Sequence, residues 1–164
     1  MEAVKQLADC PDAAKLLPEI RSNLVMALAD AKNISEIAGI PGRLTEVFGR
    51  ITAPAYPAWG ASKNTARILL AVMKVDPSRR AAMEIKYSEQ VIEIIQAHGL
   101  KTALLPSGCE SLEQTIHSCL IDQQLPPVLY TAGGWAREGA IIITAVDAVE
   151  IAHMVSNIAA WCSQ

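Results

Sequence analysis

The chain has 164 residues, a formal net charge of −3, and hydrophobic residues at 51% of its positions. This composition excludes a disordered or low-complexity protein and predicts a single domain over residues 1–164 with a substantial core. Aromatic residues make up only 4% of the chain, so the core must be built mainly from aliphatic side chains. The slightly acidic balance disfavours direct binding of nucleic acid, because proteins that coat nucleic acid are basic.

The apolar segments of the chain are too short to cross a membrane. The longest, residues 68–73 and 140–146, fall far below the ~20 residues that a spanning helix needs. The first ten residues carry charges and contain no apolar signal region, so we expect a cytoplasmic protein. No Cys-x-x-Cys pair is present, and we expect buried free thiols, with a disulfide as the alternative, for Cys10, Cys109, Cys119 and Cys162.

The first third of the chain predicts short elements separated by prolines and turns. Residues 1–20 form a short helical segment that Pro11 and Pro18 interrupt. The elements expected next are a buried strand over 23–28, a short helix over 33–38 with a capping pattern at Asn33 and Glu36, a strand over 43–51, and a loop over 52–60 that carries Tyr56 and Trp59.

The remaining two thirds alternate between helices and strands. A helix capped by Ser62 begins the series, and a strand over 81–87 follows. Glu84 and Lys86 on the polar side of this strand are a weaker candidate site, with a salt-bridged outer face as the alternative. The pair Arg79 and Arg80 is expected at the surface. The later elements are a helix from Ser88 to His98, a strand over 100–105, a helix over 111–122, a strand over 128–130, a strand over 140–146 and a final helix opened by Asp147.

This alternation predicts an α/β fold. The strand over 140–146 is continuously apolar, as in a central strand buried on both faces. A sheet with such a strand needs cover on both sides, so we expect three layers, α/β/α.

The first candidate binding site is the start of the helix that follows Gly60. Gly60, Ala61 and Ser62 are small, and a helix N-terminus offers free N–H groups and a positive dipole end to an anion. Lys63 and Arg67 lie four residues apart and can reach the same side. Arg43 would add a bidentate phosphate donor if its strand end lies nearby. The same features also fit an ordinary helix start with a solvated basic face.

The second candidate is the glycine-rich loop before the strand over 140–146. Gly133 and Gly134 allow close backbone approach to a ligand, and Arg137 and Glu138 supply charge. The loop lacks the spacing of a phosphate-binding or dinucleotide-binding fingerprint. No metal site is predicted, because no metal-ligand spacing is found for the histidines His98, His117 and His153.

Five stretches together carry a resemblance to a known family. They are residues 17–23 (LPEIRSN), 37–43 (IAGIPGR), 60–67 (GASKNTAR), 76–83 (DPSRRAAM) and the Gly-Gly-x-x-Arg-Glu stretch over 133–138. In order and spacing they resemble the ThiN family, the domain of archaeal-type thiamine-phosphate synthases, which is often fused to a hydroxymethylpyrimidine phosphate kinase.

The resemblance implies a fold, a reaction and a set of site residues. The fold is the class II aldolase-like α/β/α architecture with a mixed sheet. The reaction joins hydroxymethylpyrimidine diphosphate to thiazole phosphate, with Mg²⁺ as the expected cofactor if the domain is catalytic. Arg43 and Asn64 occupy catalytic positions. The expected ligand-binding residues are Asn23, Gly60, Ala61, Ser62, Lys63, Arg67, Lys86, Gly133, Gly134, Arg137 and Glu138.

The chain also departs from the family pattern at polar positions. Asn64 stands where the family has a catalytic His, and Asn cannot carry a proton or a positive charge near neutral pH. Glu84 replaces an Asn, Thr131 replaces an Asp, and an Asp-Arg pair is replaced around residues 106–107. These changes predict a domain that binds thiamine phosphate or its phosphorylated precursors while turnover is weakened or lost. The alternatives are an active thiamine-phosphate synthase and a structural or interaction domain.

The expected partners follow from the same resemblance. Some archaeal regulators join a DNA-binding helix-turn-helix to a ThiN-like domain without the catalytic His. Residues 1–20 are too short for such a module, so a sensing role would need a DNA-binding partner or a longer chain. A kinase partner and a homo-oligomer are the other expectations, the latter from the high apolar fraction.

Overall fold

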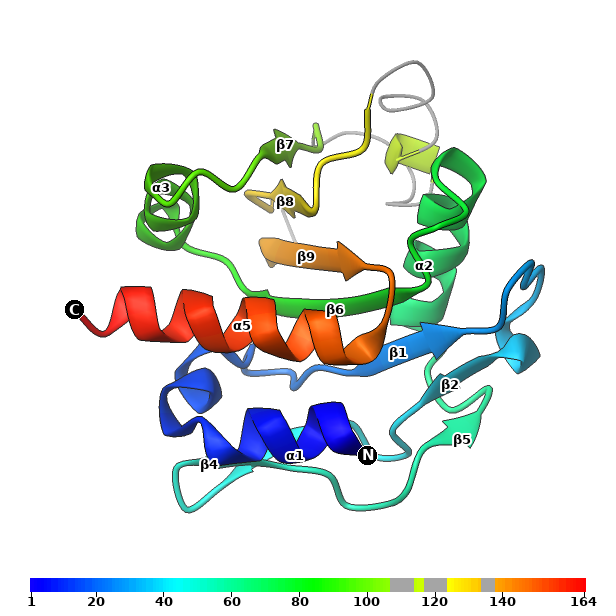
Figure 1. Cartoon of the computed structure of the whole chain (residues 1–164), viewed down its shortest axis with the longest axis horizontal. Coiled ribbons are helices and arrows are strands. Elements are labelled where there is room, and N and C mark those ends of the chain that lie inside the picture. The colour runs from blue at the N-terminus through cyan, green and yellow to red at the C-terminus, as the bar shows by residue number, and fades with distance from the viewer. Residues whose placement is uncertain (107–113, 117–123, 134–137) are drawn as a thin grey trace.

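The computed structural model describes residues 1–106, 114–116, 124–133 and 138–164 (Figure 1). Within these residues a seven-stranded mixed sheet has the order β5-β2-β1-β6-β9-β8-β7. Only β7 and β8 pair in parallel; the other neighbours are antiparallel. The strands are β1 Leu24–Ala27, β2 Ile37–Gly39, β5 Ala58–Trp59, β6 Ala81–Lys86, β7 Thr102–Leu104, β8 Val128–Thr131 and β9 Ala140–Ala145.

Helices cover both faces of this sheet. On one face, α1 (Glu2–Asp9) and α5 (Ala148–Cys162) run side by side, with the 3-10 helix η1 (Pro11–Leu16) and α3 (Glu89–Ala97) beside them (Figure 1). Their apolar side chains share a core with Met83 and Ile85 of β6. On the other face, α2 (Asn64–Val75) packs Leu69 against Val25 and Ala82. The mixed α/β fold predicted from the alternation of elements is thereby confirmed.

The clearest sequence patterns correspond to observed elements. Strand β9 lies between β6 and β8, with Ile141 and Ile143 in one core cluster and Ile142 in a second cluster on the opposite face. Asp147 caps α5 by accepting from the N–H groups of Val149 and Glu150 at 2.8 and 2.9 Å. Ser88 caps α3 by accepting from the N–H of Val91 at 3.1 Å. The strands expected over 23–28, 81–87, 100–105 and 128–130 correspond to β1, β6, β7 and β8.

The segment from 33 to 62 differs from the prediction. The expected strand over 43–51 is instead a hairpin of β3 (Thr45–Val47) and β4 (Arg50–Thr52). Phe48 and Gly49 form its turn with positive φ values of 50° and 77°, which match the twist of paired strands.

Two further predictions in this segment are wrong in detail. The predicted helix over 33–38 is a 3-10 turn, η2 (Ile34–Glu36), which has the expected capping box but ends where β2 pairs with β1. The N-cap of α2 is Lys63 rather than Ser62, and it makes no side-chain cap.

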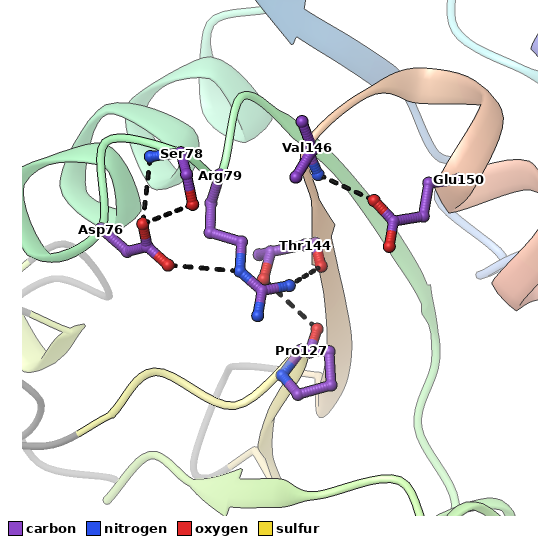
Figure 2. Close-up of polar contacts among 7 residues, drawn as sticks. All are labelled: Asp76, Ser78, Arg79, Pro127, Thr144, Val146 and Glu150. Atoms are coloured by element: carbon purple, nitrogen blue, oxygen red, sulfur yellow. Dashed lines mark hydrogen bonds and ion pairs between the residues drawn. The ribbon is translucent and has the colours of Figure 1, made fainter.

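Arg79 is not the surface residue that its sequence context suggested. Its Nη1 donates to the carbonyl of Thr144 at 3.0 Å, and its Nε lies 3.4 Å from Oδ2 of Asp76 (Figure 2). Asp76 also accepts from the backbone and hydroxyl of Ser78. Arg79 thus fixes the turn after α2 to the C-terminal end of β9, an inner strand of the sheet.

Three predictions can be compared with the structure only over the described residues. Residues 114–116 are helical, and the rest of the expected helix over 111–122 lies outside the described residues. Cys10 and Cys162 are free thiols but only half-buried, while Cys109 and Cys119 lie outside the described part. No described helix is both long and apolar enough to span a membrane.

Candidate functional site

The strand register gathers the predicted site residues at one end of the sheet. Lys86 at the end of β6 pairs with Ala140 at the start of β9, and Thr131 at the end of β8 pairs with the same residue. Strand β8 therefore ends, and β9 begins, at the end of the sheet where β6 finishes. The N-terminus of α2 lies over this end, because Asn64 and Thr65 both contact Glu84 of β6. We call this region the α2 site, comprising residues 20–23, 40–43, 60–67 and 84.

Asn23 holds the loop that carries Arg43. The residue is 4% exposed, and its side-chain amide donates to the carbonyl of Ile40 at 2.9 Å. Its Oδ1 accepts from the N–H of Ile40 at 2.8 Å. Both polar atoms of Asn23 are therefore used within the fold, and they fix the end of β2 against the start of β1.

The backbone around Arg43 adopts a rarely populated conformation. Gly42 and Arg43 have φ values of +81° and +68°, and Arg21 across the Ser22–Leu44 bridge has a φ of +69°. Non-glycine residues in this region cost of order 1–3 kcal/mol each and cluster at functional sites. The Arg43 guanidinium donates through Nη1 to the carbonyl of Ile20 at 2.7 Å. The fold thus holds an exposed cation in a defined position beside β6.

The segment that leads into α2 is closely packed against β2. Gly60 has a φ of +70° and donates its N–H to the carbonyl of Ile37 at 2.9 Å. Ser62 is buried, and a Cβ added to Gly39 would lie only 3.1 Å from the Ser62 Cβ. Ala61 is half-buried, whereas Lys63, Asn64 and Arg67 are exposed. The predicted cations thus lie on the exposed side of the first two turns of α2.

Glu84, only a weaker candidate from the sequence, is the residue of β6 that the structure brings into contact with the start of α2. Its Oε1 accepts from Thr65 Oγ1 at 3.0 Å and from Asn64 Nδ2 at 3.3 Å. Its backbone carbonyl accepts from the Ser22 hydroxyl. The salt-bridged outer face expected for Glu84 and Lys86 is therefore wrong for Glu84, which forms no salt bridge with any described residue.

The surroundings of Glu84 alter its protonation. Burial raises the pKa of the Glu84 carboxyl, and the hydrogen bonds from Thr65 and Asn64 and the charge of Arg43 oppose this only in part. A sequence signal for this position does exist. Glu84 alternates with Ala82 on the face of β6 that α2 covers, so a carboxylate there must lie against the helix.

The glycine-rich loop is described only at its ends. Gly133 has a φ of +80°, and its N–H donates to the Thr131 hydroxyl at 3.3 Å. Lys86 and Glu138 are exposed at this end of the sheet, whereas Gly134 and Arg137 lie outside the described residues. A Cβ on Gly139 would lie 2.6 Å from the Tyr87 ring and 2.9 Å from the Thr131 carbonyl. Packing thus accounts for this glycine without a ligand.

Comparison with known proteins identifies close relatives. The family model "Thiamine-phosphate synthase ThiN" matches residues 1–157. Thiamine-phosphate synthase ThiN of Methanothermobacter thermautotrophicus is 33% identical over 167 residues, which cover 95% of this chain and 88% of that protein. The bifunctional thiamine biosynthesis protein ThiDN of Methanocaldococcus jannaschii is 28% identical over 149 residues. That match covers 87% of this chain but only 36% of the longer protein.

Solved structures share the fold. The C-terminal domain of a phosphomethylpyrimidine kinase has a TM-score of 0.79 at 22% identity, covering 95% of this chain and 97% of that domain. L-fuculose-1-phosphate aldolase from Thermus thermophilus is more distant, with a TM-score of 0.51 at 9% identity over 99% of this chain and 93% of that one. Because the family model spans nearly the whole chain and a 33% identical relative aligns over 95% of it, the chain belongs to the ThiN family of thiamine-biosynthesis domains.

Proposed function

We propose that this domain binds thiamine phosphate, or its phosphorylated pyrimidine and thiazole precursors, at the α2 site, with little condensation activity. The observation that carries the proposal is the fixed position of Arg43 beside the N-terminus of α2, in a chain that matches the ThiN family over residues 1–157. An arginine and free helix N–H groups are the groups that bind phosphate esters most readily in proteins.

The chemistry of condensation explains what this site offers and what it lacks. The thiazole nitrogen is already a nucleophile, so joining it to the pyrimidine methylene requires no base at that atom. The departing diphosphate requires neutralisation, which Arg43, Lys63 and Arg67 can supply. Asn64 donates its amide to Glu84 and cannot donate a proton to the leaving group as a protonated His would. The proposal therefore separates binding, which the site supports, from efficient turnover.

The α2 site can accommodate Mg²⁺ only with help from the ligand. The described residues include no group of three His, Cys, Asp or Glu side chains arranged to hold a metal. Mg²⁺ is often held by one or two carboxylates together with substrate phosphates. Glu84, the carboxylate that the contacts place here, has its Oε1 occupied by Thr65 and Asn64, so the ligands of the ion would be diphosphate oxygens and water. When bound, the ion would supply charge neutralisation for the departing diphosphate.

Two broader features belong to the same proposal. We assign the domain to the class II aldolase-like architecture, which the likeness to L-fuculose-1-phosphate aldolase supports at the level of fold. A kinase is the partner best supported, because a similar domain forms the C-terminal part of a phosphomethylpyrimidine kinase. A homo-oligomer and a DNA-binding partner remain predictions.

A two-precursor assay tests the function. The protein is incubated with hydroxymethylpyrimidine diphosphate, thiazole phosphate and Mg²⁺, and thiamine phosphate is measured, with the ThiN enzyme of M. thermautotrophicus as the positive control. We expect at least about 100-fold less product than from the control, together with a ligand-dependent rise in melting temperature. Product at a comparable rate would instead establish an active synthase. No thermal shift with any of these ligands at millimolar concentration would favour a structural domain.

A further inference from the structure

Glu84 places a carboxylate at the α2 site, where its negative charge would repel a phosphate ligand. Its Oε1 is occupied by the hydrogen bonds from Thr65 and Asn64. Its Oε2 has no hydrogen-bond partner among the described residues. It is not fully buried either, because Ser156 Oγ is the one side-chain polar atom of the described residues that is both buried and unpaired. Oε2 therefore keeps contact with solvent at the α2 site and is free to meet a ligand.

The presence of Glu84 is not explained by an ion pair that holds Arg43 in place. The hydrogen bond of the Arg43 guanidinium runs to the carbonyl of Ile20, and no ion pair within 4.0 Å joins it to Glu84 in the described part of the chain. A negative charge that neither pairs with a cation nor suits a phosphate costs affinity for any purely anionic ligand. The cost is offset if the ligand also presents a hydrogen-bond donor to Oε2.

The structural contacts of Glu84 run through other atoms. Oε1 connects β6 to the first turn of α2, and the backbone carbonyl connects β6 to Ser22. Oε2 takes part in neither connection. A substitution that alters Oε2 can therefore keep both connections. Its effect on ligand binding can then be measured apart from any effect on folding.

We propose that Glu84 is a specificity-determining residue whose Oε2 accepts a hydrogen bond from an amino group of the ligand, selecting an aminopyrimidine phosphate over a thiazole phosphate. The assignment rests on the proposed function. An aminopyrimidine carries an exocyclic amino group beside a ring nitrogen, so it offers a donor and an acceptor to a carboxyl group. The thiazole phosphate ring offers no N–H donor. An acceptor that gives up its contact with water on ligand binding without gaining a donor strongly penalises a ligand that lacks one.

The test compares Glu84→Gln with wild type by isothermal titration calorimetry. Gln keeps an acceptor for Thr65 and Asn64 but puts a donor in place of Oε2. We expect the affinity for hydroxymethylpyrimidine phosphate to fall about tenfold or more, and that for thiazole phosphate to stay the same or rise. Glu150→Gln is the matched control, because Glu150 Oε2 accepts from the Val146 N–H beyond the far end of β9. This control should bind both ligands as wild type does.

Each other outcome overturns the assignment in a distinguishable way. An equal loss for both ligands would show a structural role for Glu84, and an unchanged or higher affinity for the aminopyrimidine would show that Oε2 makes no contact with it. Wild-type protein that binds neither ligand would overturn the proposed function itself. If Glu84→Gln does not fold, a pyrimidine phosphate lacking the amino group replaces the variant. On wild type it must bind about tenfold more weakly, and equal affinity would refute the proposal.

Discussion

At the scale of single residues, the hydrogen bond between Asn64 and Glu84 limits what position 64 can do. The Asn64 amide donates one N–H to Oε1 of Glu84 at 3.3 Å, which leaves its second N–H and its Oδ1 for a ligand. Neither group carries a charge or a transferable proton, so Asn64 gives a departing diphosphate less help than a protonated histidine would. The same neighbour would act differently on a histidine, because a nearby carboxylate favours the protonated imidazole.

This leads to a prediction for Asn64→His. The carboxylate of Glu84 should hold the new imidazole protonated near neutral pH, giving the site a cation and proton donor at the position where the resemblance places the catalytic His. We expect the two-precursor assay to yield at least about tenfold more thiamine phosphate than wild type, within the range that acid–base groups contribute.

The double variant Asn64→His/Glu84→Gln serves as the control for that effect. It keeps the imidazole but removes the charge that holds it protonated, so the gain should shrink. An assay in which Asn64→His forms no more product than wild type would count against this mapping of the site.

At the scale of elements, the contacts of Arg79 join the turn after α2 to β9 (Figure 2). Thr144 is fully buried, and its carbonyl accepts from Arg79 Nη1 while its hydroxyl donates to the Pro127 carbonyl at 3.3 Å. These bonds connect α2, β8 and β9 at the end of β9 away from Ala140. The cluster therefore stabilises the fold without taking part in the α2 site.

We expect Arg79→Ala to lower the free energy of unfolding by about 1–3 kcal/mol, because a buried carbonyl loses its donor. Urea denaturation followed by circular dichroism measures this change. Arg80→Ala, at the neighbouring arginine with no side-chain hydrogen bond to the described residues, should change it by less than about 0.5 kcal/mol. Equal effects from the two variants would mean that Arg79 makes no structural contribution of its own.

The sequence predicted those elements whose signal is local. The apolar alternation of β6, the β-branched run of β9 and the caps at Ser88 and Asp147 are each readable within a few residues. The β3–β4 hairpin was missed because Phe48 occupies a turn position that usually carries Asn, Asp or Gly. Strands β2 and β5 were missed because they are short and depend on pairing with β1 and with each other.

The same division applies to the site. Arg43 was predicted from its residue type and from the family resemblance, Asn64 from the resemblance alone, and the structure places both beside Glu84. The contacts of Glu84 with Thr65 and Asn64 join residues about twenty positions apart, so no local pattern contains them. The inward role of Asn23 likewise depends on the tertiary contact with Ile40.

At the scale of the whole molecule, net charge is a poor guide to the ligand. The chain carries a formal charge of −3, yet the α2 site holds Arg43, Lys63 and Arg67 near a single helix start. The aromatic residues are distributed unusually as well. Trp59 is 59% exposed on the edge strand β5 and Tyr56 is 79% exposed in the preceding loop, while aliphatic side chains form the core. The local placement of charge therefore supports the proposed phosphate ligand, whereas the overall composition does not point to it.

The most direct test of the account is calorimetric titration of thiamine phosphate into wild type, Arg43→Ala and Arg50→Ala. Arg50 is the matched control, since it is also exposed and donates to a backbone carbonyl, that of Ala8 at 3.1 Å, but from the β3–β4 hairpin. Binding by wild type and Arg50→Ala, with affinity at least about tenfold weaker in Arg43→Ala, is the result we predict. Absence of binding by wild type, or equal affinity in all three proteins, would contradict a phosphate-ligand site built around Arg43 and α2.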